Sequence, residues 1–376
     1  PDLYGAWVQI GVTIGLLLTF ATLGFQTTVI RFLSGNKDKN KVSSLFHLML
    51  IIVTINTLIL LFITLFFQDI LSRFIFAENS FRYFVPLTGL WLMVQAIYTL
   101  NISFLRSRNK IKLLSLINIG HTILKIIVLY LILVVFTGNL VTVIEFYIII
   151  DFIFSLIIYF FEVVKSVGIS IKLYDLKNKL KDLFKFSLPF IPNGALMWIL
   201  ASSDRYFIVH LLSLSDNAIY SVAYRLVSIL SLFYMSFGFV AYPLLVEFWE
   251  KNQKNKVREI LEKSTKVYMF FVIPSIFGLY AFGSKIILIL TTKNYSVPPT
   301  LILWVSLGIL FLGIYQINVY TIHLIKKTYY NTIIFSIAAT INIILNYFFI
   351  KAIGIEGAAI STFISYLFLA STVTIL

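Results

Sequence analysis

The chain has 376 residues, of which 60% are hydrophobic and only 12% are charged, and its mean hydropathy is +0.96. A soluble domain usually carries about twice that share of charged residues, so the composition excludes a water-soluble globular protein and indicates a polytopic membrane protein. The absence of Cys excludes disulfides and thiol catalysis.

The apolar residues fall into segments of membrane-spanning length. A helix that crosses a bilayer needs about 20 mostly apolar residues, and eleven stretches meet this need. The longest break between them, 162–185, is too small for a soluble catalytic domain. The eighth stretch is short, and we expect residues 285–292 after it to lie along the outer interface. In chain order the stretches are 4–30, 45–67, 84–105, 113–136, 140–161, 186–212, 218–246, 267–282, 300–325, 329–350 and 357–376.

The basic residues are concentrated in alternate loops. The loops after spans one, three, five, seven and nine carry 22 of the 30 Lys and Arg residues, and the even loops carry five. Since cytoplasmic loops are enriched in Lys and Arg, we expect the odd loops to face the cytoplasm. The net charge of +14 is therefore a topology signal that also suits anionic lipid headgroups, and it does not indicate nucleic-acid binding. This topology predicts a further helix before Pro1, which gives twelve or more spans in the intact chain.

Two pairs of segments suggest an internal duplication. Residues 108–133 resemble 326–351, and residues 1–7 resemble 214–220. An offset of about 215 residues spans six helices, so the two halves have the same orientation. We expect an N-terminal helix bundle at 1–161, a basic cytoplasmic linker at 162–185 and a C-terminal helix bundle at 186–376.

Several sequence blocks, in order along almost the whole chain, resemble landmarks of one family. This family is the Wzx-type polysaccharide flippases of the multidrug/oligosaccharidyl-lipid/polysaccharide exporter superfamily. The blocks are DLYG at 2–5 with LGFQTTVIRF at 23–32, KFSLPFIP at 185–192, SSDRYFI at 202–208 with AIYSVAY at 218–224, and NIILN at 342–346 with GIEGAA at 354–359.

The resemblance implies an all-α fold of two pseudo-repeated helix bundles in a V. It implies a non-enzymatic flippase that moves undecaprenyl-diphosphate-linked oligosaccharide from the cytoplasmic to the outer leaflet by alternating access. Such a protein serves O-antigen, capsule or exopolysaccharide biosynthesis in the bacterial plasma membrane. We expect a monomer that meets membrane lipids and the polysaccharide polymerase machinery, with H⁺ or Na⁺ coupling by analogy. Four scattered His residues have no metal-ligand spacing, so we expect no metal and no cofactor.

Six ionisable side chains lie inside the spans. Each costs about 2.5–3.5 kcal/mol at bilayer depth on insertion scales and is therefore a functional candidate. Arg205, for which we find no partner at the same depth, is the main candidate for binding the diphosphate, because its planar fork suits phosphate oxygens. Arg31, at the inner end of span one, is a further candidate. The six are Lys125, Glu145, Asp151, Asp204, Arg205 and Arg225.

The alternative is that these charges pair between neighbouring helices. Asp204 and Arg225 each lie about 12 Å below the outer surface at 1.5 Å per residue, and Lys125 and Asp151 also match in depth. If they are unpaired, Lys125 and Arg225 are substrate-binding candidates. Asp204, Asp151 and Glu145 are then candidates for binding a proton or Na⁺, whereas an adjacent cation would hold a carboxylate ionised.

Three other functions would make different demands on the sequence. A multidrug or organic-cation exporter of the same superfamily needs free carboxylates, so Asp151, Glu145 and Asp204 would be unpaired. A lipid II flippase is a nearer variant of the flippase. A membrane polysaccharide polymerase or glycosyltransferase needs catalytic groups in a sizeable outer loop, and the outer loops here are short.

Overall fold

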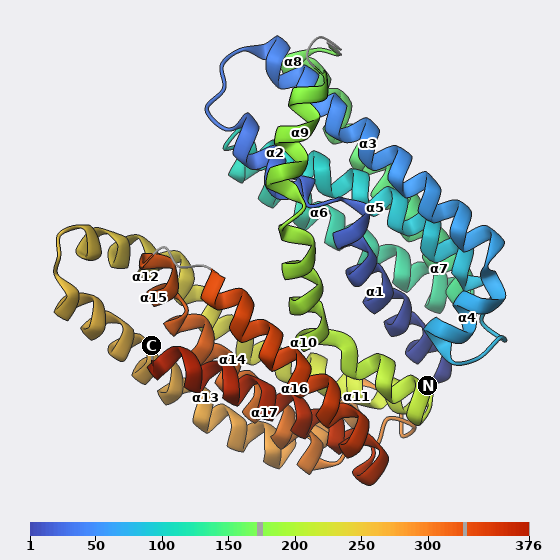
Figure 1. Cartoon of the computed structure of the whole chain (residues 1–376). Coiled ribbons are helices and arrows are strands. Elements are labelled where there is room, and N and C mark those ends of the chain that lie inside the picture. The colour runs from blue at the N-terminus through green and yellow to red at the C-terminus, as the bar shows by residue number, and fades with distance from the viewer. Residues whose placement is uncertain (171–175, 326–328, 376) are drawn as a thin grey trace. The chain divides into compact units, whose positions relative to one another are not determined.

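The computed structural model is all-α in the part of the chain that it describes, residues 1–170, 176–325 and 329–375 (Figure 1). Eleven helical segments within these ranges are long and apolar enough to cross a membrane, which confirms the number of spans expected from hydropathy. Lys172, Lys326 and Lys327, which belong to the basic loops of the predicted topology, lie outside the described residues. So does 326–328, the start of one expected repeat segment.

Side-chain caps and one glycine set the helix limits in the first part of the chain. Asp38 accepts the backbone N–H groups of Asn40 and Lys41 at the start of α3, as an N-cap residue does. Gly24, with φ of +72°, separates α1 from α2, and a Cβ there would lie 2.5 Å from the Ser187 carbonyl oxygen, so only glycine fits. These elements are α1 (Asp2–Ala21), α2 (Phe25–Leu33), α3 (Lys39–Phe66), α4 (Gln68–Phe76), α5 (Phe84–Ser107), α6 (Ile111–Tyr130), the π-helix η1 (Leu131–Val135), α7 (Leu140–Ile158), the π-helix η2 (Tyr159–Val164), α8 (Lys165–Val167) and α9 (Leu176–Ser187).

Two of the later helices are joined directly by a short 3₁₀ turn, η3 (Ser228–Leu230), without an intervening loop. Ser213 caps the first of them by accepting the N–H of Asp216 at 3.0 Å. The elements are α10 (Phe190–Leu211), α11 (Leu214–Val227), α12 (Ser231–Glu250), α13 (Lys254–Leu290), α14 (Pro299–Asn318), α15 (Tyr320–Leu324), α16 (Tyr329–Ile353) and α17 (Ile355–Ile375).

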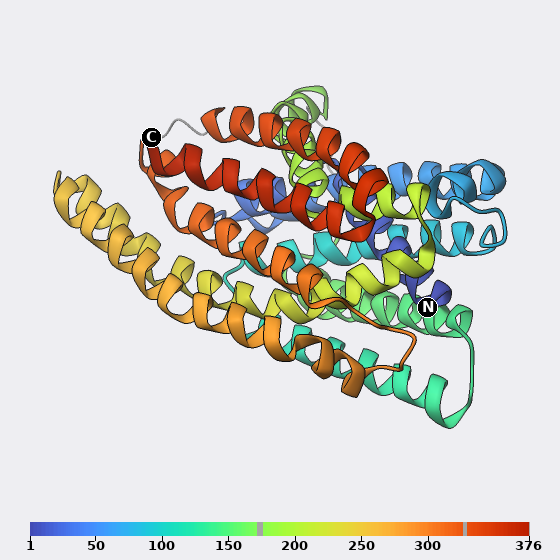
Figure 2. The same cartoon turned by 90° about the horizontal axis from the view of Figure 1, so that it is seen from below.

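Helix α13 departs from the sequence-based expectation. It has 37 residues and runs past Pro274 to Leu290 (Figure 2, yellow to orange). The expectation that residues 285–292 lie along the outer interface was therefore wrong for Lys285–Leu290. The residues after Lys285 are all Ile or Leu and favour continuation of a membrane helix, and a long Lys side chain can extend its charged end to the interface. At the other end, Arg258–Glu262 and Lys263–Glu259 form ion pairs at 2.7 and 2.6 Å.

The contacts divide the chain into two compact units, which we call the N-unit, Ile10–Ala195, and the C-unit, Pro1–Gln9 with Leu196–Leu376. These limits differ from the division at 161 and 186 expected from sequence. The start of α1 belongs to the C-unit because it packs on α11, where a Cβ on Gly5 would lie 2.0 Å from the Leu214 carbonyl oxygen. The start of α10 belongs to the N-unit because a Cβ on Gly194 would lie 2.6 Å from a Thr19 methyl carbon.

Each unit is organised around one central helix. In the N-unit, α5 packs against α2, α3 and α7. Helix α6 is peripheral: its main contacts are with α5, α7 and η1, and none of its residues is buried. In the C-unit, α14 packs against α11, α12, α13 and α17, and α17 also packs against α16. Small residues permit close approach of membrane helices. In the GIEGAA block, Ala358 and Ala359 are buried, and a Cβ on Gly357 would lie 2.2 Å from the Phe349 carbonyl oxygen.

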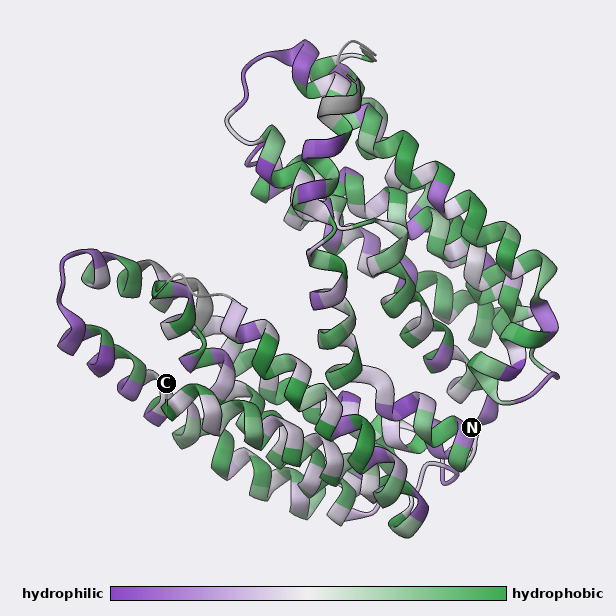
Figure 3. Cartoon of the chain, viewed as in Figure 1, coloured by the Kyte–Doolittle hydropathy of each residue, from purple (hydrophilic) through white to green (hydrophobic). Residues whose placement is uncertain are grey.

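The hydropathy of the helices matches a bilayer environment. Figure 3 shows apolar residues along the helices, with polar residues gathered at helix ends and in loops. Many large apolar side chains are exposed on helices, including Phe270 at 72% and Phe277 at 68% on α13. Such a surface is favourable only against lipid or another protein. The fold thus places the few charges inside the spans among apolar neighbours.

Candidate functional site

Asp151 of α7 is fully buried in the N-unit and binds donors from two other helices. Trp91 of α5 donates its indole N–H to Oδ2 at 2.8 Å. From α6, Lys125 Nζ lies 2.7 Å and His121 Nε2 lies 2.5 Å from Oδ1. The Lys125–Asp151 ion pair that was expected from depth matching is therefore confirmed. His121 and Lys125 reach one carboxylate because residues four apart lie on the same helix face.

Aromatic rings complete this group, which we call the Asp151 cluster. The Lys125 ammonium lies 4.9 Å from the ring centroid of Tyr147 and 5.7 Å from that of Trp91, within the range of cation–π attraction. Tyr98 stacks on the His121 ring at 5.1 Å. The side chains of His121 and Lys125 are 13% and 17% exposed. The cluster is thus a buried carboxylate whose partners on α6, Lys125 and His121, are themselves partly exposed.

In the C-unit, the adjacent residues Asp204 and Arg205 of α10 form a second buried pair. Arg205 Nη1 lies 2.8 Å from Asp204 Oδ1, and the Arg205 backbone N–H donates to the same oxygen at 2.9 Å. Nη1 also donates to the Ala201 carbonyl at 2.9 Å. Tyr220 of α11 donates its hydroxyl to Asp204 Oδ2 at 2.5 Å. Both carboxylate oxygens therefore have donors.

Aromatic side chains also enclose this Asp204 cluster. The guanidinium carbon of Arg205 lies 4.7 Å from the ring centroid of Tyr224 and 5.5 Å from that of Tyr220. Arg205 is 8% exposed. Tyr366 of α17 donates its hydroxyl to the Leu200 carbonyl at 3.1 Å. The cluster therefore links α10, α11 and α17 in the core of the C-unit.

Two expectations about these charges were wrong. Asp204 does not pair with Arg225, and Arg205 does have a partner at its own depth, namely Asp204. The two residues diverge by about 100° around the helix, but the long Arg side chain folds back over the preceding turn and reaches both Ala201 and Asp204. Sequence spacing alone understates this reach, because Arg has a long stem and a wide donor fork.

The other candidate residues lie apart from both clusters. Arg31 is exposed in the last turn of α2, Arg225 is exposed on α11, and Glu145 is exposed on α7. None of the three forms an ion pair within the described ranges. Their charges are therefore available to other molecules.

Sequence reasoning missed Trp91, Tyr220 and Tyr224 as members of the clusters. Trp91 is 60 residues from Asp151, and nothing in the sequence links them. Tyr220 and Tyr224 stand one helical turn apart in the AIYSVAY block, and this spacing was a usable signal. The described residues contain no group of three or more His, Asp or Glu side chains that could hold a metal ion.

Two units of membrane-length helices, each with one cation-paired buried carboxylate, define a polytopic membrane protein. The chain belongs to the polysaccharide biosynthesis protein family, which matches residues 1–298. This confirms the family suggested by the sequence blocks.

Two archaeal proteins are similar in sequence. An uncharacterized membrane protein of Methanocaldococcus jannaschii is 30% identical over 191 residues, which are 50% of this chain and 38% of that protein. The probable low-salt glycan biosynthesis flippase Agl15 of Haloferax volcanii is 22% identical over 201 residues, 54% of this chain and 42% of that protein. The match thus spans about two fifths of the length of these relatives. It supports a multi-pass membrane protein and does not favour a bacterial source.

Two solved structures share the fold. An inward-facing multidrug resistance transporter of the MATE family has a TM-score of 0.81 at 14% identity, over 99% of this chain and 88% of that one. The lipid II flippase MurJ in its inward closed conformation has a TM-score of 0.80 at 19% identity, over 100% of this chain and 80% of that one. The chain therefore has the all-α fold that the resemblance implied, and it shares this fold with both solved structures.

Proposed function

We propose that the protein is a flippase that moves a polyprenyl-diphosphate-linked oligosaccharide from the cytoplasmic to the outer leaflet by alternating access. The step would serve the assembly of a surface glycan at the cytoplasmic membrane. Membership of the polysaccharide biosynthesis protein family supports this cargo. So does the similarity to a relative named as a probable glycan biosynthesis flippase.

One observation favours an anionic cargo over an organic cation. Both buried carboxylates are already engaged, Asp151 with Lys125 and Asp204 with Arg205. An exporter of organic cations needs a carboxylate that the cargo can approach, and displacing a buried cationic partner is strongly unfavourable. Among the described candidate residues, two exposed cations, Arg31 and Arg225, remain for the diphosphate. The pairing of both buried carboxylates is the main structural support for a lipid-linked glycan as the cargo.

The candidate residues then divide by exposure. We assign headgroup binding to Arg31 and Arg225, because their guanidinium groups are exposed and suit phosphate oxygens. Lys125 is a secondary contact, since it is partly exposed and bound to Asp151. Arg205 is almost completely buried and its Nη1 donates to both Asp204 and Ala201, so we assign it to holding α10 in place.

The same pairing bears on ion coupling. Asp151 and Asp204 are already bound by Lys125 and Arg205, so a coupling cation would have to displace a buried partner from either carboxylate. Glu145 is exposed and forms no ion pair within the described ranges. It is the better candidate of the three for binding H⁺ or Na⁺, if return of the empty carrier is ion-driven.

The test is transport by the full-length protein in proteoliposomes. The cargo is a fluorescent undecaprenyl-diphosphate oligosaccharide, and its leaflet is read by a membrane-impermeant quencher. A fluorescent organic cation is assayed in parallel. Movement of the lipid-linked glycan without cation uptake supports the proposal. Cation uptake without glycan movement would assign the protein to drug export, and movement of neither would refute both functions.

A further inference from the structure

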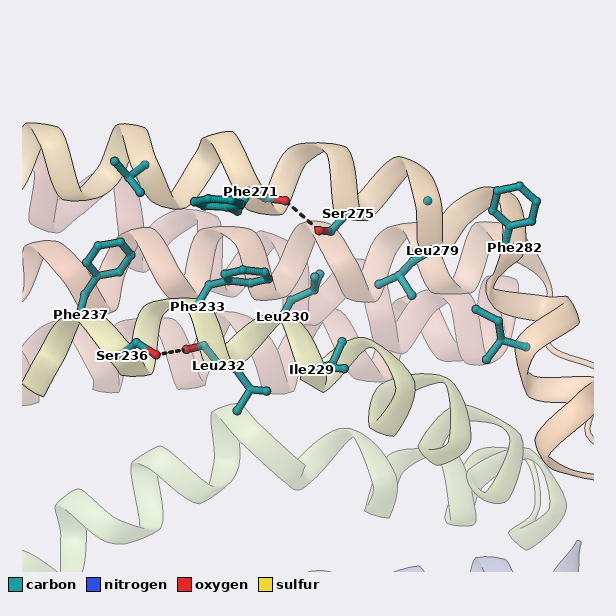
Figure 4. Close-up of a pocket in the computed structure, with 13 residues that line it drawn as sticks. Ile229, Leu230, Leu232, Phe233, Ser236, Phe237, Phe271, Ser275, Leu279 and Phe282 are labelled. Carbon is teal, nitrogen blue, oxygen red and sulfur yellow. Dashed lines mark hydrogen bonds between the residues drawn. The ribbon is translucent and has the colours of Figure 1, made fainter.

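The C-unit carries a long apolar groove between the α11–η3–α12 segment and α13. Figure 4 shows its walls, with Leu230, Phe233 and Phe237 on one side and Phe271, Leu279 and Phe282 on the other. Its volume is about 960 Å³. Phe233 and Phe271 stack across it at 5.7 Å with nearly parallel rings. All of the lining residues belong to helices in the segments expected to cross the membrane.

The groove offers no polar group to a ligand. Among the described residues that line it, Ser236 and Ser275 carry hydroxyl groups, and each donates to a carbonyl of its own helix, Leu232 and Phe271, at 2.8 Å. Gly278 opens the α13 wall, because a Cβ there would meet nothing within 4 Å. The groove therefore fits an apolar chain and leaves room for it beside Gly278.

The length of the groove distinguishes between lipid chains. Its lining on α13 runs from Val267 to Ile286, about 29 Å at 1.5 Å per residue, and its lining on η3 and α12 runs from Ile229 to Phe237, about 12 Å. The hydrocarbon core of a bilayer is about 30 Å thick, so an acyl chain of a phospholipid extends along about half of the α13 wall. A polyprenyl chain, which is longer than one leaflet, can follow all of it.

A second pocket of about 540 Å³ lies further along the same two helical segments, and its mostly apolar lining includes a few polar side chains. Ile287 lines this pocket and directly follows Ile286 of the groove. On the other wall, Leu226 of the pocket lies about one helical turn before Ile229 and Leu230 of the groove. Leu226 also packs against α13 at Gly283. The two hollows thus follow each other along the same pair of helices.

Arg225 is the cation of this pocket. It is exposed and forms no ion pair in the described part of the chain, while Tyr4, Thr291 and Tyr295 add hydroxyl groups to the lining. Asp2 is close enough to influence Tyr295 electrostatically, but it does not bridge to Arg225. Tyr295 lies in an even loop, which the charge pattern assigns to the outer face. An anionic headgroup that enters this pocket from the outer side would therefore meet an unneutralised guanidinium.

We propose that this groove and pocket bind a polyprenyl phosphate lipid, with the phosphate on Arg225 towards the outer end of α13 and the chain along α12 and α13 past Gly278. The inference rests on the proposed function, because a flippase of lipid-linked glycans must accommodate a polyprenyl chain. It adds a separate site for the lipid carrier within one unit.

The test measures lipid retention by native mass spectrometry of the full-length protein released from detergent. The probes are undecaprenyl phosphate, uncharged undecaprenol, geranyl phosphate and phosphatidylglycerol. We expect undecaprenyl phosphate to be retained most strongly. Gly278→Trp should lower retention of both undecaprenyl lipids by about tenfold, because it fills the groove. Arg225→Ala should lower retention of the phosphate by about tenfold and leave undecaprenol unchanged.

The matched control is Gly120→Trp on α6, where a Cβ also meets nothing within 4 Å. It should retain undecaprenyl phosphate like the unmodified protein, and equal melting temperatures show that the variants fold. Equal retention by Gly278→Trp, or equal retention of phosphatidylglycerol, would overturn the proposal. If Gly278→Trp fails to fold, the Arg225→Ala variant still tests the site. Weaker retention of undecaprenyl phosphate with unchanged retention of undecaprenol supports it, and equal retention of both refutes it.

This assay reads binding without transport, so the two proposals fail separately. Selective retention by a protein that moves no glycan in proteoliposomes would sustain the lipid site and refute the flippase. Glycan transport together with unchanged lipid binding in both variants would support the flippase and refute the lipid site.

Discussion

Arg205 donates to the carboxylate of Asp204, its immediate neighbour in sequence, from both its backbone N–H and its guanidinium. The pair is almost completely buried, with side-chain exposures of 9% and 2%. An ion pair of this kind is strongly destabilised by removal of one partner alone, because the other charge stays buried. Arg205 is therefore a structural residue of the C-unit in this arrangement.

Replacement of Arg205 by Ala should lower stability by about 3–5 kcal/mol, since Asp204 would keep only the Tyr220 hydroxyl and a backbone N–H. The melting temperature of the detergent-solubilised protein measures this loss. Arg225→Ala is the control, because Arg225 is exposed, and it should change the melting temperature little. The double variant Asp204→Asn, Arg205→Met should recover much of the loss. An unchanged melting temperature in Arg205→Ala would contradict the structural role.

The number of spans was predictable from the sequence because hydropathy and charge act over whole segments. A lipid-facing helix needs about 20 apolar residues wherever it packs, and the computed structure has eleven such segments. The end of α13 was misjudged because the single charge of Lys285 looked like a boundary. In the structure the Ile and Leu residues that follow it continue the helix to Leu290.

The partners of the buried charges were predictable only in part. Lys125 and Asp151 were found because their helices are consecutive and their depths match. The Asp204–Arg205 pair was missed because depth matching considers neighbouring helices and ignores how far an Arg side chain folds back. No sequence pattern predicts Trp91 as a partner of Asp151, since this contact depends on how α5 packs against α7.

Trp91→Phe should destabilise the N-unit, because it removes the indole N–H that Asp151 Oδ2 accepts at 2.8 Å. A hydrogen bond to a charged group contributes about 1.5–3 kcal/mol, and the ring volume changes too. Thermal unfolding in detergent is the measurement. Trp304→Phe, where the ring packs on Phe363, is the matched control and should lose less. Equal losses in the two variants would mean that ring volume, not the hydrogen bond, determines the effect.

Gly357→Ala should lower the melting temperature, because its Cβ would lie 2.2 Å from the Phe349 carbonyl oxygen at the contact of α16 with α17. Overpacking of this kind typically costs about 1–3 kcal/mol, and the clashing atom is backbone. Gly120→Ala on α6 is the opposite case, since its Cβ meets nothing within 4 Å. It should be neutral or stabilising by up to about 1 kcal/mol through its higher helix propensity. A stable Gly357→Ala variant would show that α17 can move away from α16 at little cost.

Arg31→Ala should slow glycan-lipid movement without unfolding the protein. Arg31 is exposed in the last turn of α2 and makes no ion pair among the residues described, so its removal leaves no buried charge unpaired. Loss of one charge-assisted contact to a phosphate corresponds to about a tenfold or greater fall in the transport rate at low substrate. Arg31→Lys should retain part of the rate, because it keeps the charge but loses the bidentate fork. The control is Arg73→Ala, an exposed arginine in the last turn of α4 on the side expected to face outward. If Arg31→Ala and Arg73→Ala transport at the same rate as the unmodified protein, Arg31 is only an interfacial anchor, and headgroup capture on the cytoplasmic side must depend on other cations.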